Sequence, residues 1–466
     1  ALGSGALFSN STASNNTGLG YKALMSNTTG DKNVAVGANA LDANTSASDN
    51  TAVGYNCLGD NTTGVNNTGL GVNALLKNTT ANNNTAVGAL ALTLNTTGAS
   101  NTAVGASALD ANTTGYNNVG IGKDALGQNT SGFENVAVGK DALQSNTTGV
   151  FNIGIGVNAL NVNTTADNNV AVGRAALSNN TTGIQNVAVG SSALSANTTA
   201  GDNTAVGFQA LQNNTTGGDN TAIGDSALQA CTTGSNNTAL GREALINSTT
   251  ALNNVALGNY TMSTITTAGA NVAIGVRAMQ NATSAEDNVC IGYQTGDSIG
   301  GGDKNVLIGH GTDVSSSSVD LEYTIGTGLT GKGQQQMFLG GNLGTFNEAN
   351  ESHFDTTSDE RIKKNIVNYD TGLSIINQLQ VRNFEYKTED EIITDNPELK
   401  DVIKSAVVDK TGIQTGLIAQ ESEKVLPSTV VTCSTGIKSL HTDDIFWHML
   451  NAIKELSVKV TALEAA

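Results

Sequence analysis

The sequence predicts a mainly β protein in which a parallel β-solenoid, or β-roll, of 17-residue repeats is followed by a small α+β domain. Three observations predict this fold: a glycine recurs every 17 residues from Gly3 to Gly326, a short β-branched segment precedes each glycine, and the composition changes at Ser358. A fixed repeat of this length indicates one structural unit copied along the chain. We therefore expect a repeat shaft at 1–326, a transition or tip region at 327–357 and a C-terminal domain at 358–466.

Each repeat reads as one short strand followed by turns. Positions are numbered from the periodic glycine, which is position 0. The residue at −1 is aliphatic and that at −3 is mostly Thr or Val, as in Thr51-Ala52-Val53 before Gly54. Residues two apart on a strand share a face, so −3 and −1 point one way and −2 points the other way. Leu at +4 adds a second apolar contact, and 17 residues are too few for a strand–helix–strand unit of about 30 residues. Each repeat is therefore one coil, whose strand pairs with the coils before and after it.

Asparagine and threonine fill the turns of the repeat. Asn is usual at −4 and +7, and the second of these opens an Asn-Thr-Thr-Gly turn, as at 61–64. Identical polar side chains in stacked strands form ladders, so we expect Asn ladders along the shaft. Both prolines, Pro397 and Pro427, lie outside the repeats. This placement agrees with a hydrogen-bonded ladder, because proline would remove a bond from it.

The residue at −2 is always Ala or Gly from Gly18 to Ala273, which requires an explanation. Two interpretations remain open. The side chain faces the opposite wall of its own thin coil, or it faces a neighbouring chain around a symmetry axis. A thin coil has little core of its own, which favours association of several chains.

The repeat resembles the head repeats of trimeric autotransporter adhesins. The segments that carry this resemblance are Asn-Val-Ala-Val-Gly at 33–37 and Asn-Thr-Ala-Ile-Gly at 220–224. The resemblance covers roughly residues 1–326 and implies a left-handed parallel β-roll that assembles as a homotrimer. The longer turn, which is rich in Asn and Thr, departs from that family.

Composition excludes several functions. The formal net charge is −18, although only 13% of residues are charged, and a nucleic-acid partner would require a basic surface. No apolar stretch is long enough to insert into a membrane. The four cysteines form neither a disulfide pattern nor a metal pattern, and the four histidines are scattered, so we expect no metal and no cofactor. The chain begins within a repeat, and we expect a missing N-terminal region to carry an attachment point.

The transition region concentrates aromatic residues that are rare elsewhere in the chain. Phe338, Phe346 and Phe354 lie within it, and Met337 to Leu339 reads as a strand. The three rings mark either a contact surface or a cap on the core of the shaft, since the end of a solenoid requires a cap.

The C-terminal domain alternates helices and strands. We expect helices over 369–379 and 422–426, strands over 381–387, 416–419 and 429–432, and a long final helix. Apolar residues of that helix recur at spacings of three and four, which indicates a coiled-coil seam. They are Phe446, Met449, Ile453, Leu456, Val460 and Leu463. The seam either joins three chains or packs against its own domain.

Three blocks of this domain closely resemble the intramolecular chaperone of endosialidase-type phage tail spikes and tail fibres. They are Ser-Asp-Glu-Arg-Ile-Lys-Lys-Asn-Ile at 358–366, Gly-Leu-Ile-Ala-Gln-Glu at 416–421 running on to Val-Leu-Pro at 425–427, and Ala-Ile-Lys-Glu-Leu at 452–456. The segment from His441 to Phe446 departs from the family. Such domains hold three chains together while a β-rich shaft folds and then cut themselves off.

The resemblance implies one cleavage, at the Thr357–Ser358 bond. Ser358 would be the nucleophile, Lys363 the general base with a pKa lowered by burial, and Asp359 an orienting or charge-stabilising group. Ser358 and Lys363 are five residues apart and cannot meet within one regular helix or strand. The pair therefore requires a turn or two subunits. Without the resemblance, Ser358 reads as an ordinary helix N-cap.

These observations favour a structural viral tail fibre over an enzyme with an external substrate, because no glycosidase or lyase constellation is visible in the shaft. The expected activity is single-turnover autoproteolysis. The expected partners are two further copies of the chain, a host receptor or glycan, and the remainder of a virion or fibre, which implies location on a virion or an extracellular surface. The alternatives are a bacterial trimeric surface adhesin and a fibre of a contractile injection system with the same chaperone domain.

Overall fold

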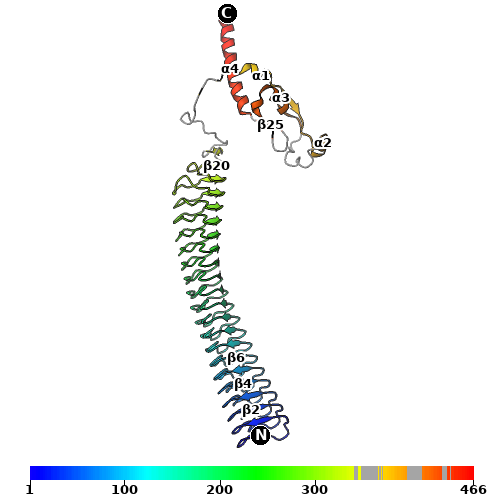
Figure 1. Cartoon of the computed structure of the whole chain (residues 1–466), viewed down its shortest axis with the longest axis vertical. Coiled ribbons are helices and arrows are strands. Elements are labelled where there is room, and N and C mark those ends of the chain that lie inside the picture. The colour runs from blue at the N-terminus through cyan, green and yellow to red at the C-terminus, as the bar shows by residue number, and fades with distance from the viewer. Residues whose placement is uncertain are drawn as a thin grey trace. The chain divides into compact units, whose positions relative to one another are not determined.

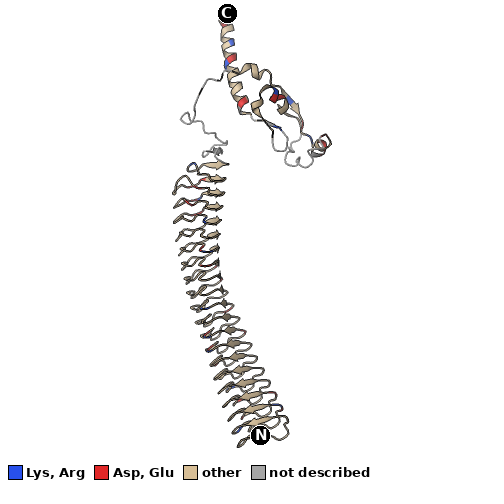
Figure 2. Ribbon diagram, viewed as in Figure 1, with Lys and Arg blue, Asp and Glu red and all other residues tan. Residues whose placement is uncertain are grey.

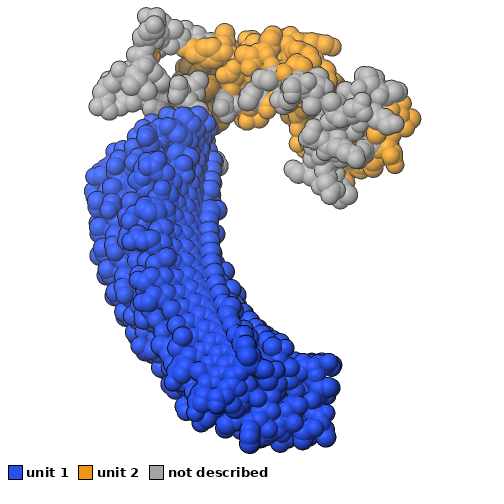
Figure 3. Space-filling view, turned by 60° about the horizontal axis from the view of Figure 1, so that its bottom comes forward, with its two compact units in different colours: residues 1–356 blue, residues 357–466 orange. Residues whose placement is uncertain are grey.

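The computed structural model describes residues 1–340, 345–347, 366, 369, 371–395, 412–432, 438–440 and 442–466. The chain divides into two compact units, Ala1–Thr356 and Thr357–Ala466, which are blue and orange in Figure 3. Thr357, Ser358, Asp359, Lys363, Phe354 and Cys433 lie outside the described residues.

Unit 1 is a parallel β-solenoid of 17-residue coils, which confirms the predicted fold class (Figure 1). Each coil contributes one three-residue strand, and each strand pairs in parallel with the strand 17 residues later, as Val136 does with Ile153 and Ala137 with Gly154. The strands are Thr17–Leu19 (β1), Val34–Val36 (β2), Thr51–Val53 (β3), Thr68–Leu70 (β4), Thr85–Val87 (β5), Thr102–Val104 (β6), Val119–Ile121 (β7), Val136–Val138 (β8), Ile153–Ile155 (β9), Val170–Val172 (β10), Val187–Val189 (β11), Thr204–Val206 (β12), Thr221–Ile223 (β13), Thr238–Leu240 (β14), Val255–Leu257 (β15), Val272–Ile274 (β16), Val289–Ile291 (β17), Val306–Ile308 (β18) and Tyr323–Ile325 (β19).

The period shortens at the end of the shaft. Strand β20 (Met337–Leu339) pairs in parallel with β19, but Tyr323 lies opposite Met337, only 14 residues later. Strand β21 (Thr345–Asn347) then pairs with β20 in the antiparallel direction. The sheet therefore ends in a smaller coil and a reversed strand, and Met337 to Leu339 is a strand as predicted.

The residues at −2, +3 and +4 form the core of each coil. In one coil these are Ala52, Cys57 and Leu58, and all three are fully buried in a single chain. A Cβ built on Gly69, at −2 of the following repeat, would lie 2.4 Å from Cys57 Sγ. The −2 position is therefore small because it faces the opposite wall of its own coil, and the alternative of a neighbouring chain at this position is wrong.

Four backbone positions have positive φ in every regular coil, at 0, +2, +4 and −5. At the periodic glycine, Gly139 has φ +138°, and a Cβ there would lie 2.5 Å from the carbonyl oxygen of Gly156 in the next coil. The leucine at +4 is another of the four, as at Leu143 with φ 51°. The left-handed backbone conformation is costly for leucine. Complete burial of the leucine side chain offsets this cost.

The expected Asn ladders are confirmed. The −4 ladder joins a side chain to the backbone of the next coil, whereas the +7 ladder joins side chain to side chain. At −4, Asn135 Oδ1 accepts the backbone N–H of Asn152 at 3.0 Å, and Asn135 Nδ2 donates to the Gly149 carbonyl at 2.8 Å. At +7, Asn146 Nδ2 donates to Asn129 Oδ1 at 2.8 Å and also to the Gly149 carbonyl at 3.0 Å. Both ladders satisfy buried polar groups in the interior of the coil.

Three cysteines take the place of core or ladder residues. Cys57, Cys231 and Cys290 are free and buried. Burial raises the pKa of the Cys57 thiol to about 12 and that of Cys231 to about 11. These thiols are therefore protonated and unreactive at neutral pH.

Unit 2 is a small α+β assembly, as predicted. Its elements are α1 (Leu373–Ile376), β22 (Val381–Phe384), α2 (Glu389–Asp395), β23 (Gln414–Leu417), α3 (Ala419–Val425), the 3-10 turn η4 (Pro427–Thr429), β24 (Val430–Thr432), β25 (Lys438–Leu440) and α4 (Asp443–Glu464). Strands β22 and β23 form one antiparallel pair, and β24 and β25 form another. Helix α1 is shorter than the expected helix over 369–379, because the chain enters it through Gly372, whose non-helical backbone is the N-cap. Both α3 and α4 begin earlier than the apolar pattern indicated.

Candidate functional surfaces

The predicted cleavage site, with Thr357, Ser358, Asp359 and Lys363, lies outside the described residues, so its geometry stays a prediction. The described part of unit 2 shows how the segment that follows is held. Tyr369 Oη lies 2.6 Å from His448 Nε2, and His448 Nδ1 lies 3.0 Å from the Thr371 carbonyl oxygen. A carbonyl only accepts, so Nδ1 carries the proton and Nε2 accepts from the tyrosine hydroxyl.

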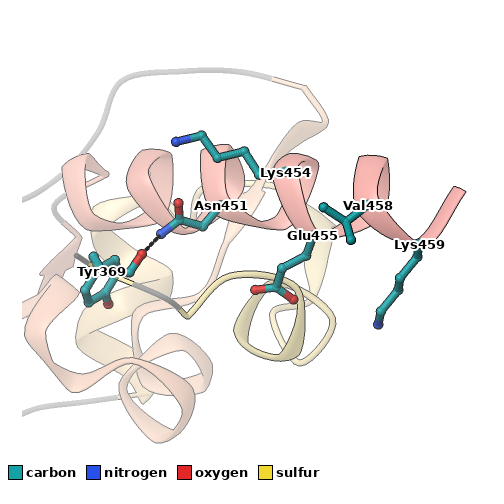
Figure 4. Close-up of a pocket in the computed structure, with 6 residues that line it drawn as sticks. All are labelled: Tyr369, Asn451, Lys454, Glu455, Val458 and Lys459. Atoms are coloured by element: carbon teal, nitrogen blue, oxygen red, sulfur yellow. Dashed lines mark hydrogen bonds between the residues drawn. The ribbon is translucent and has the colours of Figure 1, made fainter. Parts of the chain in front are cut away.

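His448 is 1% exposed, and its ring centroid lies 5.0 Å from that of Tyr369. Asn451, one helical turn later, donates to the Tyr369 carbonyl, as Figure 4 shows. These bonds fix the chain at 369–371 to helix α4. Because the partners are 79 residues apart, nothing in the local sequence around His448 indicated this role.

Helix α4 presents two different faces. Ile445, His448 and Ala452 are buried against unit 2. The helix seam, defined as Phe446, Met449, Ile453, Leu456, Val460 and Leu463, is exposed in the single chain. The side chain of Ile453 in the middle of the seam is 62% exposed. The interpretation in which the seam packs against its own domain is therefore wrong, and the seam stays available to other chains.

A shallow pocket of about 430 Å³ opens beside α4 (Figure 4). It is lined by Tyr369, Asn451, Lys454, Glu455, Val458 and Lys459. Glu455 Oε1 accepts the backbone N–H of Leu373 at 3.3 Å, which ties α1 to α4. Among all described residues, no group of three or more His, Cys, Asp or Glu side chains could hold a metal ion.

The shaft carries a second apolar surface. The sheet face, defined as the side chains at −3 and −1 of β1–β19, points away from the core and is partly exposed. Leu70 at −1 is 47% exposed, and Leu240 and Ile274 are also exposed. Figure 2 shows the strands in tan, because none of them carries Lys, Arg, Asp or Glu. The sheet face is thus an uncharged apolar and threonine-rich strip along the shaft.

The end of the shaft is closed by Phe338, one of the three aromatic residues that the sequence singled out in the transition region. Phe338 is only 6% exposed and lies beneath Lys332, whose Nζ is 4.7 Å from the ring centroid. Phe338 therefore caps the core and is not a contact surface. The side chain of Phe346 and all of Phe354 lie outside what the structure describes, so their predicted role is untested.

Glu322 ends the −4 ladder. It stands where every earlier coil from Asn16 has asparagine, and it is fully buried. Its carboxylate accepts the backbone N–H groups of Ser315 at 2.8 Å and Gly333 at 2.5 Å. The replacement of Asn by Glu at −4 is the one sequence feature that could have indicated this role. It marks the coil in which the regular period ends.

Within the described residues, no helix is both long enough and apolar enough to cross a bilayer.

Residues 358–431 match the model of a family described as the chaperone of endosialidase, whose name classes it among the peptidases. The match confirms the resemblance found in the sequence for this segment, and it ends before helix α4. No curated protein matches the chain. The chain therefore joins a β-solenoid shaft to a segment that matches the model of the chaperone of endosialidase family.

Proposed function

We propose that this chain forms a homotrimeric viral tail fibre for host attachment, and that its C-terminal domain assembles the trimer and then releases itself by self-cleavage. The observation that carries the proposal is the presence of two uncovered apolar surfaces, the sheet face and the helix seam, in a chain whose C-terminal region matches a chaperone family. Exposed apolar surfaces of this extent mark sites of association.

In a trimer, each of the two apolar surfaces would pack against the same surface of the other copies. Three copies of the helix seam would pack as a parallel coiled coil with apolar residues at spacings of three and four. The sheet face has no charge along its length, so its burial between copies would leave no unpaired ion. Parallel pairing between many strands forms slowly and exposes edges, which is why a clamp that aligns three chains would favour correct folding.

Self-cleavage would then make assembly irreversible. In the proposed step, the Ser358 hydroxyl attacks the Thr357 carbonyl carbon while the neutral amine of Lys363 takes the hydroxyl proton. The peptide C–N bond breaks as that proton passes to the Ser358 nitrogen, which leaves an ester between Thr357 and the Ser358 oxygen. Water hydrolyses the ester and releases two chains. Loss of the clamp would leave the shaft kinetically trapped.

The test is the mass of the freshly expressed chain under denaturing conditions. The wild-type protein should give two pieces, 1–357 and 358–466, and Ser358→Ala should stay intact. Lys363→Met should also stay intact, whereas Lys364→Met, a matched loss of the neighbouring charge, should be cleaved. A wild-type chain that stays intact in a stable oligomer would contradict self-cleavage and leave a permanent trimerisation domain.

A further inference from the structure

Three aromatic side chains form a cluster on the turn that precedes the strand of the shaft. Tyr116 and Phe133 occupy −6 in successive coils, and Phe151 occupies −5 in the next coil. The rings of Tyr116 and Phe133 are stacked with centroids 4.8 Å apart and planes 4° apart. Phe151 meets Phe133 edge to face at 5.5 Å. We propose that this aromatic cluster is a binding platform for a neutral oligosaccharide.

The backbone holds the cluster in place. The N–H of Glu134 donates to the Tyr116 carbonyl at 3.1 Å, and the N–H of Phe151 donates to the Phe133 carbonyl at 3.3 Å. These bonds join successive coils at the turn, so the rings are set at the spacing of the solenoid before any ligand arrives. A preformed rigid surface loses little conformational entropy on binding.

The solenoid does not need these rings to fold. The −6 position is Ala99 in the coil before Tyr116 and is glycine at Gly201 and Gly218, and those coils have the same strand and turns. Tyr116 is 41% exposed and Phe151 is 46% exposed. The cluster therefore leaves a large part of its aromatic surface in solvent, which is typical of a recognition site.

Polar groups with free bonding capacity border the rings. Asn117, Glu134 and Asn168 lie at −5 in this stretch, are exposed, and their side chains form no hydrogen bond within the described residues. Amide and carboxylate groups bind sugar hydroxyls as donors and acceptors. The stacked faces of Tyr116 and Phe133 cover each other, so the polarised C–H groups of a hexose would contact the ring surface that Tyr116 and Phe151 leave in solvent.

The charge of the protein and the length of the aromatic cluster indicate which class of sugar would bind. Glu134 at the platform and the net charge of −18 disfavour an anionic glycan, so the ligand is a neutral hexose chain. Three successive coils span two coil spacings, about 9–10 Å. That distance accommodates two linked hexose rings. The cluster lies at −6 and −5, outside the sheet face at −3 and −1 that is proposed to pack between copies.

The inference rests on the proposed attachment function and names the place on the shaft where attachment would occur. The test uses the full-length protein on a printed array of neutral oligosaccharides, followed by saturation-transfer NMR with the sugar that binds best. The triple variant Tyr116→Ser, Phe133→Ser, Phe151→Ser should bind that sugar at least tenfold more weakly. Phe208→Ser removes an aromatic residue that is 52% exposed and contacts no other ring among the described residues, and this variant should bind within twofold of wild type.

Three outcomes would overturn the platform: no neutral sugar binds the wild-type protein, the triple variant binds as tightly as wild type, or the triple variant loses its oligomeric state. The last result would show that the rings pack between chains. The native mass of the wild-type protein is measured on the same sample. A single-chain mass would overturn the trimer proposal whatever the sugar result, and a trimer without sugar binding would overturn the platform alone.

Discussion

Each coil of the shaft buries its own alanine and leucine side chains, whereas unit 2 leaves the apolar seam of its longest helix in solvent. In the shaft, Leu58 is fully buried, and its N–H bonds to the Ala74 carbonyl in the next coil. In unit 2, Ile453 is 62% exposed, and the bonds that organise α4 reach residues about 80 positions away, as from His448 to Tyr369. Each coil of the shaft therefore has a core of its own within one chain and exposes only its sheet face, whereas the longest helix of unit 2 leaves its whole apolar seam in solvent.

The largest effect should come from charging the helix seam. Ile453→Asp with Leu456→Asp would place two carboxylates in the proposed three-chain interface, where unpaired charges are strongly unfavourable. We expect complete loss of the trimer, and aggregation of the shaft during folding. Light scattering coupled to size exclusion measures both.

Val458→Asp is the matched control for the helix seam. Val458 is exposed on the same helix but does not belong to the seam. The control should assemble as wild type does, and equal loss of the trimer in both variants would mean that the seam has no special role.

The next effect tests the periodic glycine of the shaft. Gly139→Ala would place a Cβ 2.5 Å from the Gly156 carbonyl oxygen at φ +138°, so we expect a loss of stability of about 2–4 kcal/mol. Gly311→Ala is the control, because its φ is +58° and no atom lies within 4 Å of the added Cβ. It should cost about 1 kcal/mol. Thermal unfolding of the shaft compares the two variants. Equal decreases in unfolding temperature would contradict the close backbone contact between coils at Gly139.

A smaller difference separates the two Asn ladders. Asn135→Ala removes the acceptor of the Asn152 N–H, which should cost about 2–3 kcal/mol. Asn146→Ala removes only side-chain bonds and one of two donors to the Gly149 carbonyl, which should cost about 1 kcal/mol. The sequence agrees with this ranking, because +7 changes to Cys231 and later to Ile265, while −4 stays Asn until Glu322. Chemical denaturation measures both variants, and the reverse order would contradict this account of the ladders.

The most local predicted effect lies at the end of the shaft. Glu322→Gln would present an amide donor to the N–H groups of Ser315 and Gly333, leaving one of them without an acceptor. We expect a local loss of about 1–2 kcal/mol. Hydrogen exchange should be faster at 313–333 and unchanged in earlier coils. Faster exchange along the whole shaft would show that Glu322 is not a local cap.

The repeat made much of the shaft predictable from the sequence. Period, strand position and parallel register follow from the glycine and the β-branched pair before it, because each coil contacts only the next one. The left-handed conformation of Leu143 was not predictable, since leucine disfavours it and only burial in the finished coil offsets the cost. Whether Ala52 faces its own coil or a neighbouring chain was left open by the sequence. The alternation of side chains along a strand does not say which side of the strand is the core.

The C-terminal unit was predictable mainly through its resemblance to a family. The helix seam was visible as a spacing, but its exposure depends on which face of α4 packs against unit 2. That face is set by the Tyr369–His448 contact between distant segments, which no local pattern indicates. The roles of Ser358, Asp359 and Lys363 remain predictions, because they rest on the family resemblance and lie outside the described residues.

The most direct test of the central claim is the native mass of Ser358→Ala, in which the clamp would stay attached. If two other copies cover the sheet face and the helix seam, the particle should have three times the chain mass of 47.3 kDa. A stable, soluble particle with the mass of one chain would contradict the claim. It would show that both apolar surfaces remain in solvent and that the shaft folds without partners.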